Sequence, residues 1–236
     1  MLHEWLKDSK HTVVFTGAGM STESGLPDFR STNRGIWRKK DPSKIASVDA
    51  LNHHVEDFIN FYRDRVLGVK EVGPHKGHQI LADWENNGLI QSIITQNVDG
   101  FHQAAGSKHV HELHGTLQEL HCQSCGKIYD SSAYINEDYH CSCGGILRPS
   151  IVLFGEMLPE EAFSAAFEHA KKADLFIVLG SSLSVTPANQ FPEIAKQNGA
   201  KLVIVNQEKT PLDHYADLVV FDRKIGAYLE ETNKLL

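Results

Sequence analysis

The stretch Thr12-Val-Val-Phe-Thr-Gly-Ala-Gly-Met-Ser-Thr-Glu-Ser-Gly25 joins an apolar run to a glycine-containing turn. Its first part, Thr12–Thr16, predicts a buried strand. Glycines in the turn let the backbone approach a pyrophosphate, and the N-terminus of a following helix would attract that anion. Thr22 stands where the usual dinucleotide fingerprint has its third glycine, so an ordinary turn at Gly17 and Gly19 is the alternative.

Similar apolar runs occur further along the chain and alternate with helix-like stretches. Further strands are expected at Ile90–Thr95, Leu175–Leu179, Lys201–Val205 and Asp217–Phe221. The expected helices are His75–Asn87, Pro159–Lys172 and Asn189–Asn198. Such alternation is typical of a parallel sheet with helices on both faces. We therefore predict an α/β fold built on an open, parallel, Rossmann-like sheet.

All four cysteines of the chain fall within 22 residues: Cys122, Cys125, Cys141 and Cys143. Four thiolates complete the tetrahedral shell of a structural zinc ion and leave no position open for a substrate. Two disulfides in a secreted protein are the alternative. The clustering predicts a small zinc-binding insertion module.

Two segments interrupt the strand–helix alternation, one polar and then helical, the other carrying the cysteines. We therefore expect three parts: a discontinuous Rossmann-like domain of residues 1–30, 74–116 and 150–236, a helical cofactor-loop insertion of residues 31–73, and a zinc module of residues 117–149.

Composition limits the classes of partner. The formal net charge of −7 disfavours a broad electrostatic grip on nucleic acid. No apolar run reaches the length of about 18 residues that a membrane helix needs, and the N-terminus lacks the apolar core of a signal peptide. With reduced thiols, these features predict a cytoplasmic protein. The oligomeric state is not determined by the sequence, and we expect a monomer.

Polar residues follow several predicted strands. Gly180-Ser-Ser182 and Asn206 stand at two strand ends, where open α/β sheets bind ligands. Asn97 and Asp99 can hydrogen-bond an amide and a ribose, although both residue types are common in structural turns. In the pair His111 and His114, one imidazole is a candidate general base, because it titrates near neutral pH.

Several of these motifs, taken together, resemble the sirtuins, NAD-dependent protein-lysine deacylases. They occur in the order of that family, from about residue 10 to about residue 230. The motifs are Gly17–Arg30, Thr95–His102, Leu113–Gly115, the paired cysteines, Leu147–Pro149, Phe154–Glu156 and Gly180–Ser182.

The resemblance implies a role for each matching position. The proposed NAD site comprises Gly17, Ala18, Gly19, Phe29, Arg30, Gln96, Asn97, Asp99, Gly180, Ser181, Ser182, Asn206, Lys224 and Ile225. Within it, Asn97 and Asp99 hold the ribose and the nicotinamide amide. His114, directly before a glycine, takes the role of general base, whereas His111 is off the motif. Val152 and Phe154 border the tunnel for the acylated lysine of a protein substrate, which lies as an added strand. The implied products are free lysine, nicotinamide and an O-acyl-ADP-ribose.

Three further residues bear on which acyl group the enzyme removes from lysine. Ala46, Tyr62 and Arg65 match the spacing of a triplet found in family members that remove acidic acyl groups. Tyr62 and Arg65 share a helix face, where a phenol and a guanidinium can bind a carboxylate. An amphipathic helix with a solvated charged side is the alternative, and Asp28 disfavours the acidic-acyl branch. We expect a deacetylase, with a desuccinylase, demalonylase or broader deacylase as the alternative.

Two other classes of protein remain open at this stage. An NAD-dependent dehydrogenase would produce NADH, but the full dinucleotide fingerprint is absent. A non-enzymatic zinc-ribbon module would bind nucleic acid or protein, but the zinc region is a small share of the chain. Nicotinamide release that depends on acyl-lysine separates the three classes.

Overall fold

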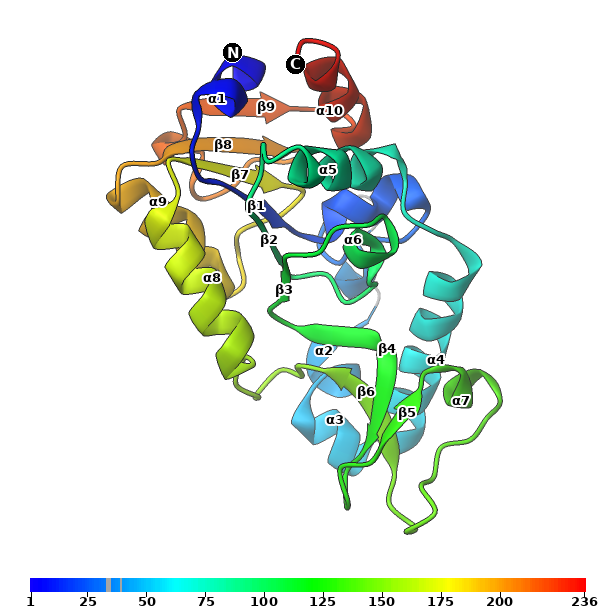
Figure 1. The fold of residues 1–236 in the computed structure, drawn as a ribbon. Coiled ribbons are helices and arrows are strands. Elements are labelled where there is room, and N and C mark those ends of the chain that lie inside the picture. Colours follow the sequence, from blue (N-terminus) through cyan, green and yellow to red (C-terminus); the bar gives the residue numbers. More distant parts are fainter. Residues whose placement is uncertain (33–34, 39) are drawn as a thin grey trace.

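A six-stranded parallel sheet forms the larger part of the molecule (Figure 1). The computed structural model describes residues 1–32, 35–38 and 40–236. In the sheet the strand order is β3-β2-β1-β7-β8-β9, the doubly wound order of nucleotide-binding domains. The strands are β1 (Thr12–Thr16), β2 (Ser92–Thr95), β3 (Val110–Glu112), β7 (Leu175–Leu179), β8 (Lys201–Asn206) and β9 (Leu218–Phe221). The predicted fold class is confirmed.

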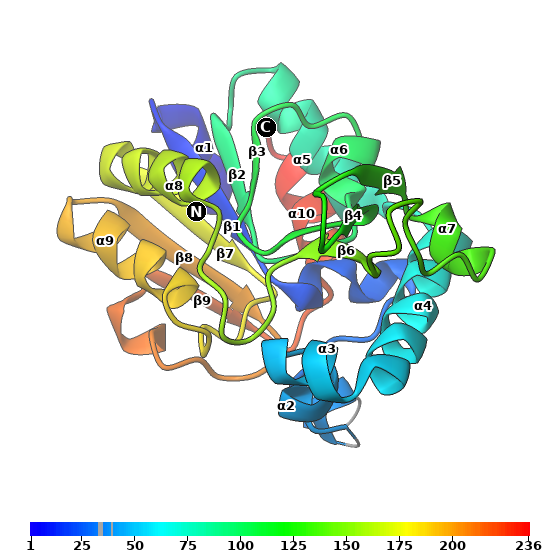
Figure 2. The same ribbon diagram turned by 90° about the horizontal axis from the view of Figure 1, so that it is seen from below.

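Helices cover both faces of this sheet (Figure 1 and Figure 2). One face carries α1 (Leu2–Asp8), α5 (Lys76–Asn86) and α10 (Ile225–Asn233); the other carries α8 (Glu160–Lys172) and α9 (Phe191–Gln197). Successive side chains of a strand point to opposite faces. Val14 accordingly belongs to the core beneath α5 and α10, and its neighbours Val13 and Phe15 belong to the core beneath α8 and α9. Burial on both faces explains why β7 is apolar throughout and why β1 has three consecutive apolar residues between its two threonines.

A second, smaller unit contains the three-stranded sheet β5-β4-β6, which is antiparallel. Its strands are β4 (Gly115–Cys122), β5 (Ile128–Asp130) and β6 (Leu147–Ile151). Four helices accompany them: α2 (Pro42–Ile45), α3 (Val48–His53), α4 (Val55–Glu71) and α7 (Ser132–Ile135). The short helix α6 (Phe101–Ala104) follows β2.

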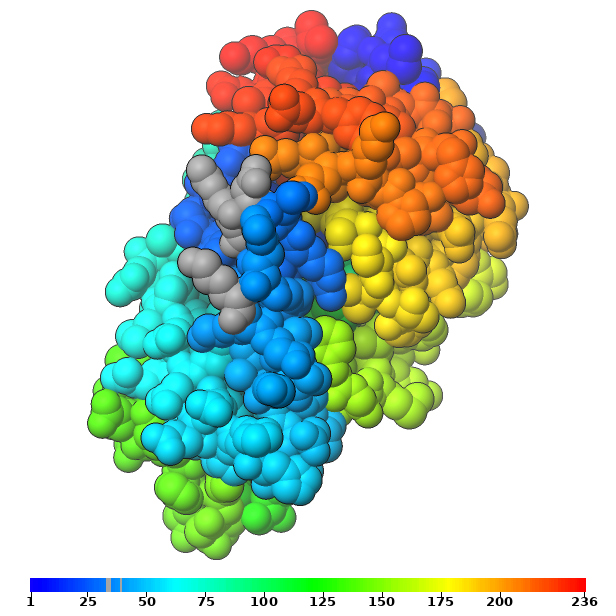
Figure 3. Space-filling view, turned by 180° about the vertical axis from the view of Figure 1, so that it is seen from behind, coloured from blue at the N-terminus to red at the C-terminus, as the bar shows by residue number. Residues whose placement is uncertain are grey.

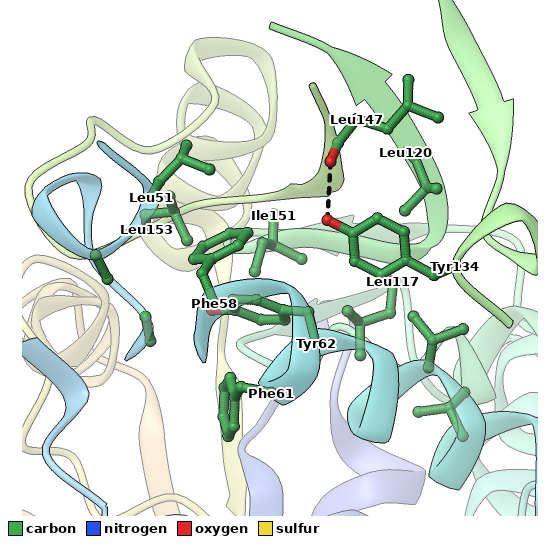
Figure 4. Close-up of a cluster of buried hydrophobic side chains, with 14 of the residues drawn as sticks. Leu51, Phe58, Phe61, Tyr62, Leu117, Leu120, Tyr134, Leu147, Ile151 and Leu153 are labelled. Carbon is green, nitrogen blue, oxygen red and sulfur yellow. Dashed lines mark hydrogen bonds between the residues drawn. The ribbon is translucent and has the colours of Figure 1, made fainter. Parts of the chain in front are cut away.

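The helical insertion and the cysteine segment share one hydrophobic core (Figure 4). Phe58 and Tyr62 of α4 pack in it with Leu120 of β4 and Ile151 of β6. The buried hydroxyl of Tyr134 donates to the carbonyl oxygen of Leu147 at 2.8 Å. The sequence-based division treats these two segments as separate parts, and their boundaries stay a prediction. In three dimensions they form one apolar cluster.

The segment after the glycine turn differs in helix type from the expectation. Residues Ala18–Ser24 form a 3₁₀ helix, η1, and not the first turns of an α-helix. It ends at Gly25, whose φ of 102° is left-handed. The other short 3₁₀ helices are η2 (Ile36–Arg38), η3 (Ala188–Gln190) and η4 (Asp213–Tyr215). Among the described residues, none of the helices has the length and apolar character of a membrane span.

Two buried histidines between the sheet and α5 make stability depend on pH. Burial lowers the pKa of His78 to about 2 and that of His102 to about 3, below an ordinary value of about 6.5. Because the unfolded chain takes up these protons near pH 6.5 and the folded chain does not, stability falls as the pH drops below that value. The loss is about 1.4 kcal/mol per pH unit for each ring.

We expect urea unfolding at pH 7, 6 and 5 to show this decline. His78→Leu removes one ring and should flatten the slope by about 1.4 kcal/mol per pH unit between pH 6 and 5. An unchanged slope in that variant would mean that His78 is not held neutral in the folded state.

Candidate active site

A cleft of about 1940 Å³ lies between the parallel sheet and the smaller unit. Its walls come from the loops after β1, β2, β7 and β8, from the segment that follows β6, and from helix α4. Figure 3 shows this side of the molecule, where blue residues near position 30 lie beside yellow and orange residues of the sheet body. The carboxyl ends of parallel strands meet along one edge, so residues far apart in sequence gather there.

The loops after β1 and β7 touch through their backbones. Gly17 N–H donates to the carbonyl oxygen of Leu179 at 3.0 Å, and Gly19 N–H donates to that of Gly180 at 2.9 Å. A Cβ atom on Gly180 would lie 2.4 Å from the backbone nitrogen of Met20. Glycine is therefore required for steric reasons. The contact leaves an open backbone surface of the type that admits a pyrophosphate.

A buried polar network connects the loops after β1 and β2. Asn97 Nδ2 donates to the Gly17 carbonyl oxygen at 3.0 Å and to Ser21 Oγ at 3.2 Å. Ser21 Oγ in turn donates to Asp99 Oδ2 at 2.7 Å. Asn97 lines the cleft, whereas Asp99 lies behind Ser21 and does not line it. Burial raises the pKa of Asp99, an effect that the bonds from Phe101 and Ser21 oppose. Sequence reasoning did not single out Ser21, although it lies within the glycine-containing stretch.

His114 faces the cleft from the connection between β3 and β4. Its Nδ1 lies 3.0 Å from the carbonyl oxygen of Gln96. A carbonyl oxygen only accepts, so Nδ1 carries the proton and Nε2 is left as a proton acceptor. Burial lowers the pKa of His114, and the bond to Gln96 partly opposes this. The ring is thus a neutral base at neutral pH.

His111 is placed elsewhere. It lies on β3, and its ring is 5.2 Å from that of His169 on α8. It does not line the cleft.

The remaining residues of the predicted NAD site gather around the same cleft. Ser181 Oγ donates to Gln96 Oε1 at 2.7 Å and joins the loops after β7 and β2. Glu208 Oε1 accepts from the backbone nitrogen and hydroxyl of Thr32 at 2.7 and 2.6 Å. Thr32 and Glu208 are 176 positions apart and carry no sequence signal of this contact. The other predicted residues that line the cleft are Ala18, Phe29, Arg30, Ser182, Asn206, Lys224 and Ile225.

Val152 and Phe154 lie on the opposite side of the cleft. Val152 N–H donates to the carbonyl oxygen of His114 at 2.8 Å, which places it directly beside the candidate base. Phe154 is bonded to the helical insertion, because its N–H donates to the Ala46 carbonyl oxygen at 3.0 Å. Its side chain is 46% exposed. This side of the cleft thus presents both backbone and apolar groups.

Tyr62 and Arg65 both line the cleft from α4, and Ala46 lines it from the end of α2. The Tyr62 ring is buried against Phe58, at a centroid distance of 4.6 Å. The Arg65 guanidinium lies over the Phe29 ring, 5.0 Å from its centroid. Within the described part of the chain, no carboxylate pairs with Arg65. This cation is therefore available to an anion in the cleft.

The four cysteines converge at the far end of the smaller unit. Their Sγ atoms all lie within 4.8 Å of one another. The Sγ distances are 3.5 Å between Cys122 and Cys143 and 3.6 Å between Cys125 and Cys141. A disulfide would require about 2.05 Å, whereas bonds of about 2.3 Å to one tetrahedral zinc ion place sulfurs about 3.8 Å apart. The donor set fits a structural zinc ion and not the disulfide alternative.

The fold and the cleft together define a Rossmann-like nucleotide-binding protein with a four-cysteine metal module. The sequence model of the Sir2 family matches residues 17–187. The chain belongs to the Sir2 family, the sirtuins.

Individual relatives agree with this assignment. An NAD-dependent protein deacetylase of Oceanobacillus iheyensis is 70% identical over 229 residues, 97% of either chain. NAD-dependent protein deacetylase 1 of Geobacillus kaustophilus is 58% identical, over 98% of this chain and 96% of the relative. A Sir2 structure with a deacetylated p53 peptide and 3′-O-acetyl ADP ribose has a TM-score of 0.94 and 39% identity, covering 99% of this chain and 96% of the other.

Proposed function

We propose that this chain is an NAD-dependent protein-lysine deacetylase. It removes acetyl groups from lysine side chains and yields nicotinamide and O-acetyl-ADP-ribose. The observation that carries the proposal is the position of His114, a neutral base whose free Nε2 faces the cleft beside Val152. The names of the relatives at 70% and 58% identity support the same activity.

The cleft suits NAD on its own chemistry. The bare backbone of the Gly17 and Gly180 loops suits a pyrophosphate. Asn97, which Ser21 holds in place, offers a buried polar group to an amide or a ribose, and Ser181 and Asn206 offer polar groups at the other end of the cleft. When bound, NAD supplies an electrophilic ribose carbon from which nicotinamide can leave.

The residues of the chain then act as positioning groups and as a base. His114 Nε2 accepts a proton from a hydroxyl group in the cleft, and the Nδ1–H bond to Gln96 keeps the ring in the required tautomer. Val152 and Phe154 guide the acyl-lysine, with the peptide backbone added as a strand beside them. The apolar rings of Phe29, Trp37 and Phe154 exclude water from the reacting groups.

Nicotinamide release tests the proposal. Zinc-loaded protein should release nicotinamide only when both NAD and an acetyl-lysine peptide are present. NADH absorbance on turnover would indicate a dehydrogenase instead. If well-folded protein produced neither nicotinamide nor NADH, only a binding module would remain.

A second candidate function rests on Arg65. The Arg65 guanidinium pairs with no carboxylate of the described residues and lines the cleft together with Tyr62, so it suits a succinyl or malonyl carboxylate, because charge-assisted bonds of this kind are strong and directional. On this alternative, the chain is a desuccinylase, demalonylase or broader deacylase. Asp28, whose presence disfavours this alternative, holds its loop by accepting from the backbone nitrogens of Arg30 and Ser31 at 3.0 and 2.7 Å.

Arg65→Met distinguishes the two candidates. If acidic acyl groups bind here, the variant should lose about 10–100-fold in kcat/KM on a succinyl-lysine peptide, since bonds to charged groups contribute about 1.5–3 kcal/mol. Activity on the acetyl peptide of the same sequence should change much less. Arg63→Met is the matched control, because Arg63 lies on the same helix as Arg65 but pairs with Glu137, outside that helix. Unchanged efficiencies on both peptides would exclude an acidic pocket at Arg65.

We further propose that the protein acts in the cytoplasm as a monomer on acylated proteins, without nucleic-acid or membrane partners. Metal-binding thiols require a reducing compartment. The net charge of −7 disfavours nucleic acid.

A further inference from the structure

Three histidines from distant parts of the sequence meet on the side of the sheet that α8 covers. We call them the histidine row: His11, His169 and His111. His11 directly precedes β1, His169 lies in the last turn of α8, and His111 lies on β3. Helix α8 contacts β3. None of the three lines the cleft, so the proposed deacetylation leaves them without a role.

Two ring nitrogens in the row face each other directly. His11 Nε2 and His169 Nδ1 are 3.1 Å apart. One of these nitrogens donates to the other, and the ring planes, whose centroids are 5.2 Å apart, differ by 18°, so the two rings are nearly parallel. Tetrahedral coordination with zinc–nitrogen bonds of about 2.0–2.1 Å separates two ligand nitrogens by about 3.3 Å and their ring centres by about 5 Å. The pair therefore has the spacing of two imidazoles on one ion.

The surroundings supply further nitrogen and a compensating charge. The His111 ring centroid is 5.2 Å from that of His169, and His111 Nε2 is buried with no hydrogen-bond partner among the described residues. Asp174 accepts from the His11 backbone nitrogen at 3.1 Å and places a carboxylate beside the row. The positive charge of Lys172, three positions after His169 on α8, disfavours a bound cation and is the charge that Asp174 would have to offset. Imidazole ligands suit zinc, nickel and copper, whereas calcium and magnesium prefer oxygen.

We propose that the histidine row is a second metal site, which binds a divalent transition-metal ion through His11 Nε2 and His169 Nδ1. The site is separate from the four thiolates and from the cleft. An ion held there joins the start of β1 to α8 and stabilises the folded state, because the unfolded chain does not bring the two rings together.

Calorimetric titration with Ni²⁺ tests the proposal, on full-length, zinc-loaded protein without an affinity tag. The wild type should take up nickel while its zinc content stays constant. His11→Ala and His169→Ala should each weaken nickel binding by about 10–100-fold, the range found for disturbed metal sites. His214→Ala is the control, because this exposed histidine lies outside the row, and it should bind nickel as the wild type does.

Thermal unfolding gives a second readout. Nickel should raise the unfolding temperature of the wild type and of His214→Ala, and should have little effect on the other two variants. No nickel uptake by the wild type, or equal uptake by all four proteins, would overturn the proposal. Both measurements are independent of deacetylase activity, so they stand whether or not the proposed function does.

Discussion

The variant His114→Ala should lose about 10²–10⁴-fold in kcat on an acetyl-lysine peptide, the contribution of a positioned general base. The physical reason is the loss of Nε2, the acceptor that the bond from Nδ1 to Gln96 holds toward the cleft. NAD binding should change little, because the glycine loops and the Asn97 network do not depend on this ring. Steady-state kinetics and calorimetric NAD titration together check the prediction.

His111→Ala is the matched control, since it removes an imidazole three positions away that does not line the cleft. It should keep near-normal turnover. If His114→Ala turned over normally, or if His111→Ala were the variant that failed, His114 would not be the base.

Cys122→Ser should cause the largest loss of stability. Structural zinc contributes about 10–16 kcal/mol in isolated zinc-finger peptides. Loss of a third of that would lower the unfolding temperature of a chain of this size by about 10 °C. Cys122 is buried in the same core as Tyr62 and Leu153, so the damage should reach the cleft and lower activity. Zinc analysis and scanning calorimetry measure both effects.

Ser142→Ala is the matched control, because it changes an exposed residue between Cys141 and Cys143 and leaves all four thiolates in place. This control should retain zinc, stability and activity. A soluble Cys122→Ser protein that lacks zinc yet unfolds cooperatively at the wild-type temperature would contradict a structural role for the metal.

The sheet was predictable where its strands are buried on both faces. β7 is a five-residue apolar run and β1 has three apolar residues between two threonines, and short apolar runs of this kind predict buried strands directly. β3 was not predicted, because it is only three half-buried residues long and includes His111. β4 and β6 were also missed. β4 has an irregular burial pattern and β6 carries Arg148 and Pro149 among its buried residues, so neither has the regular period of a strand.

The site was predictable as a set of motifs but not as a set of contacts. Gly17, Asn97 and Ser181 all reach one cleft, as the strand-end argument predicts, and His114 reaches it from the connection after β3, a strand that was not predicted. The position of Asp99 behind Ser21 was not predictable, because it depends on how the loops after β1 and β2 pack.

By itself, the sequence determined the alternation of strands and helices, the glycine loops and the four thiolates. These are local properties, set by side-chain period, backbone sterics and ligand chemistry within short stretches. The resemblance to the sirtuins had already distinguished His114 from His111. Only the tertiary structure decided that Thr32 meets Glu208, that Asp99 lies behind Ser21, and that His11 meets His169. Such contacts form when distant segments pack together, and the geometry of that packing is not encoded in any one of the segments.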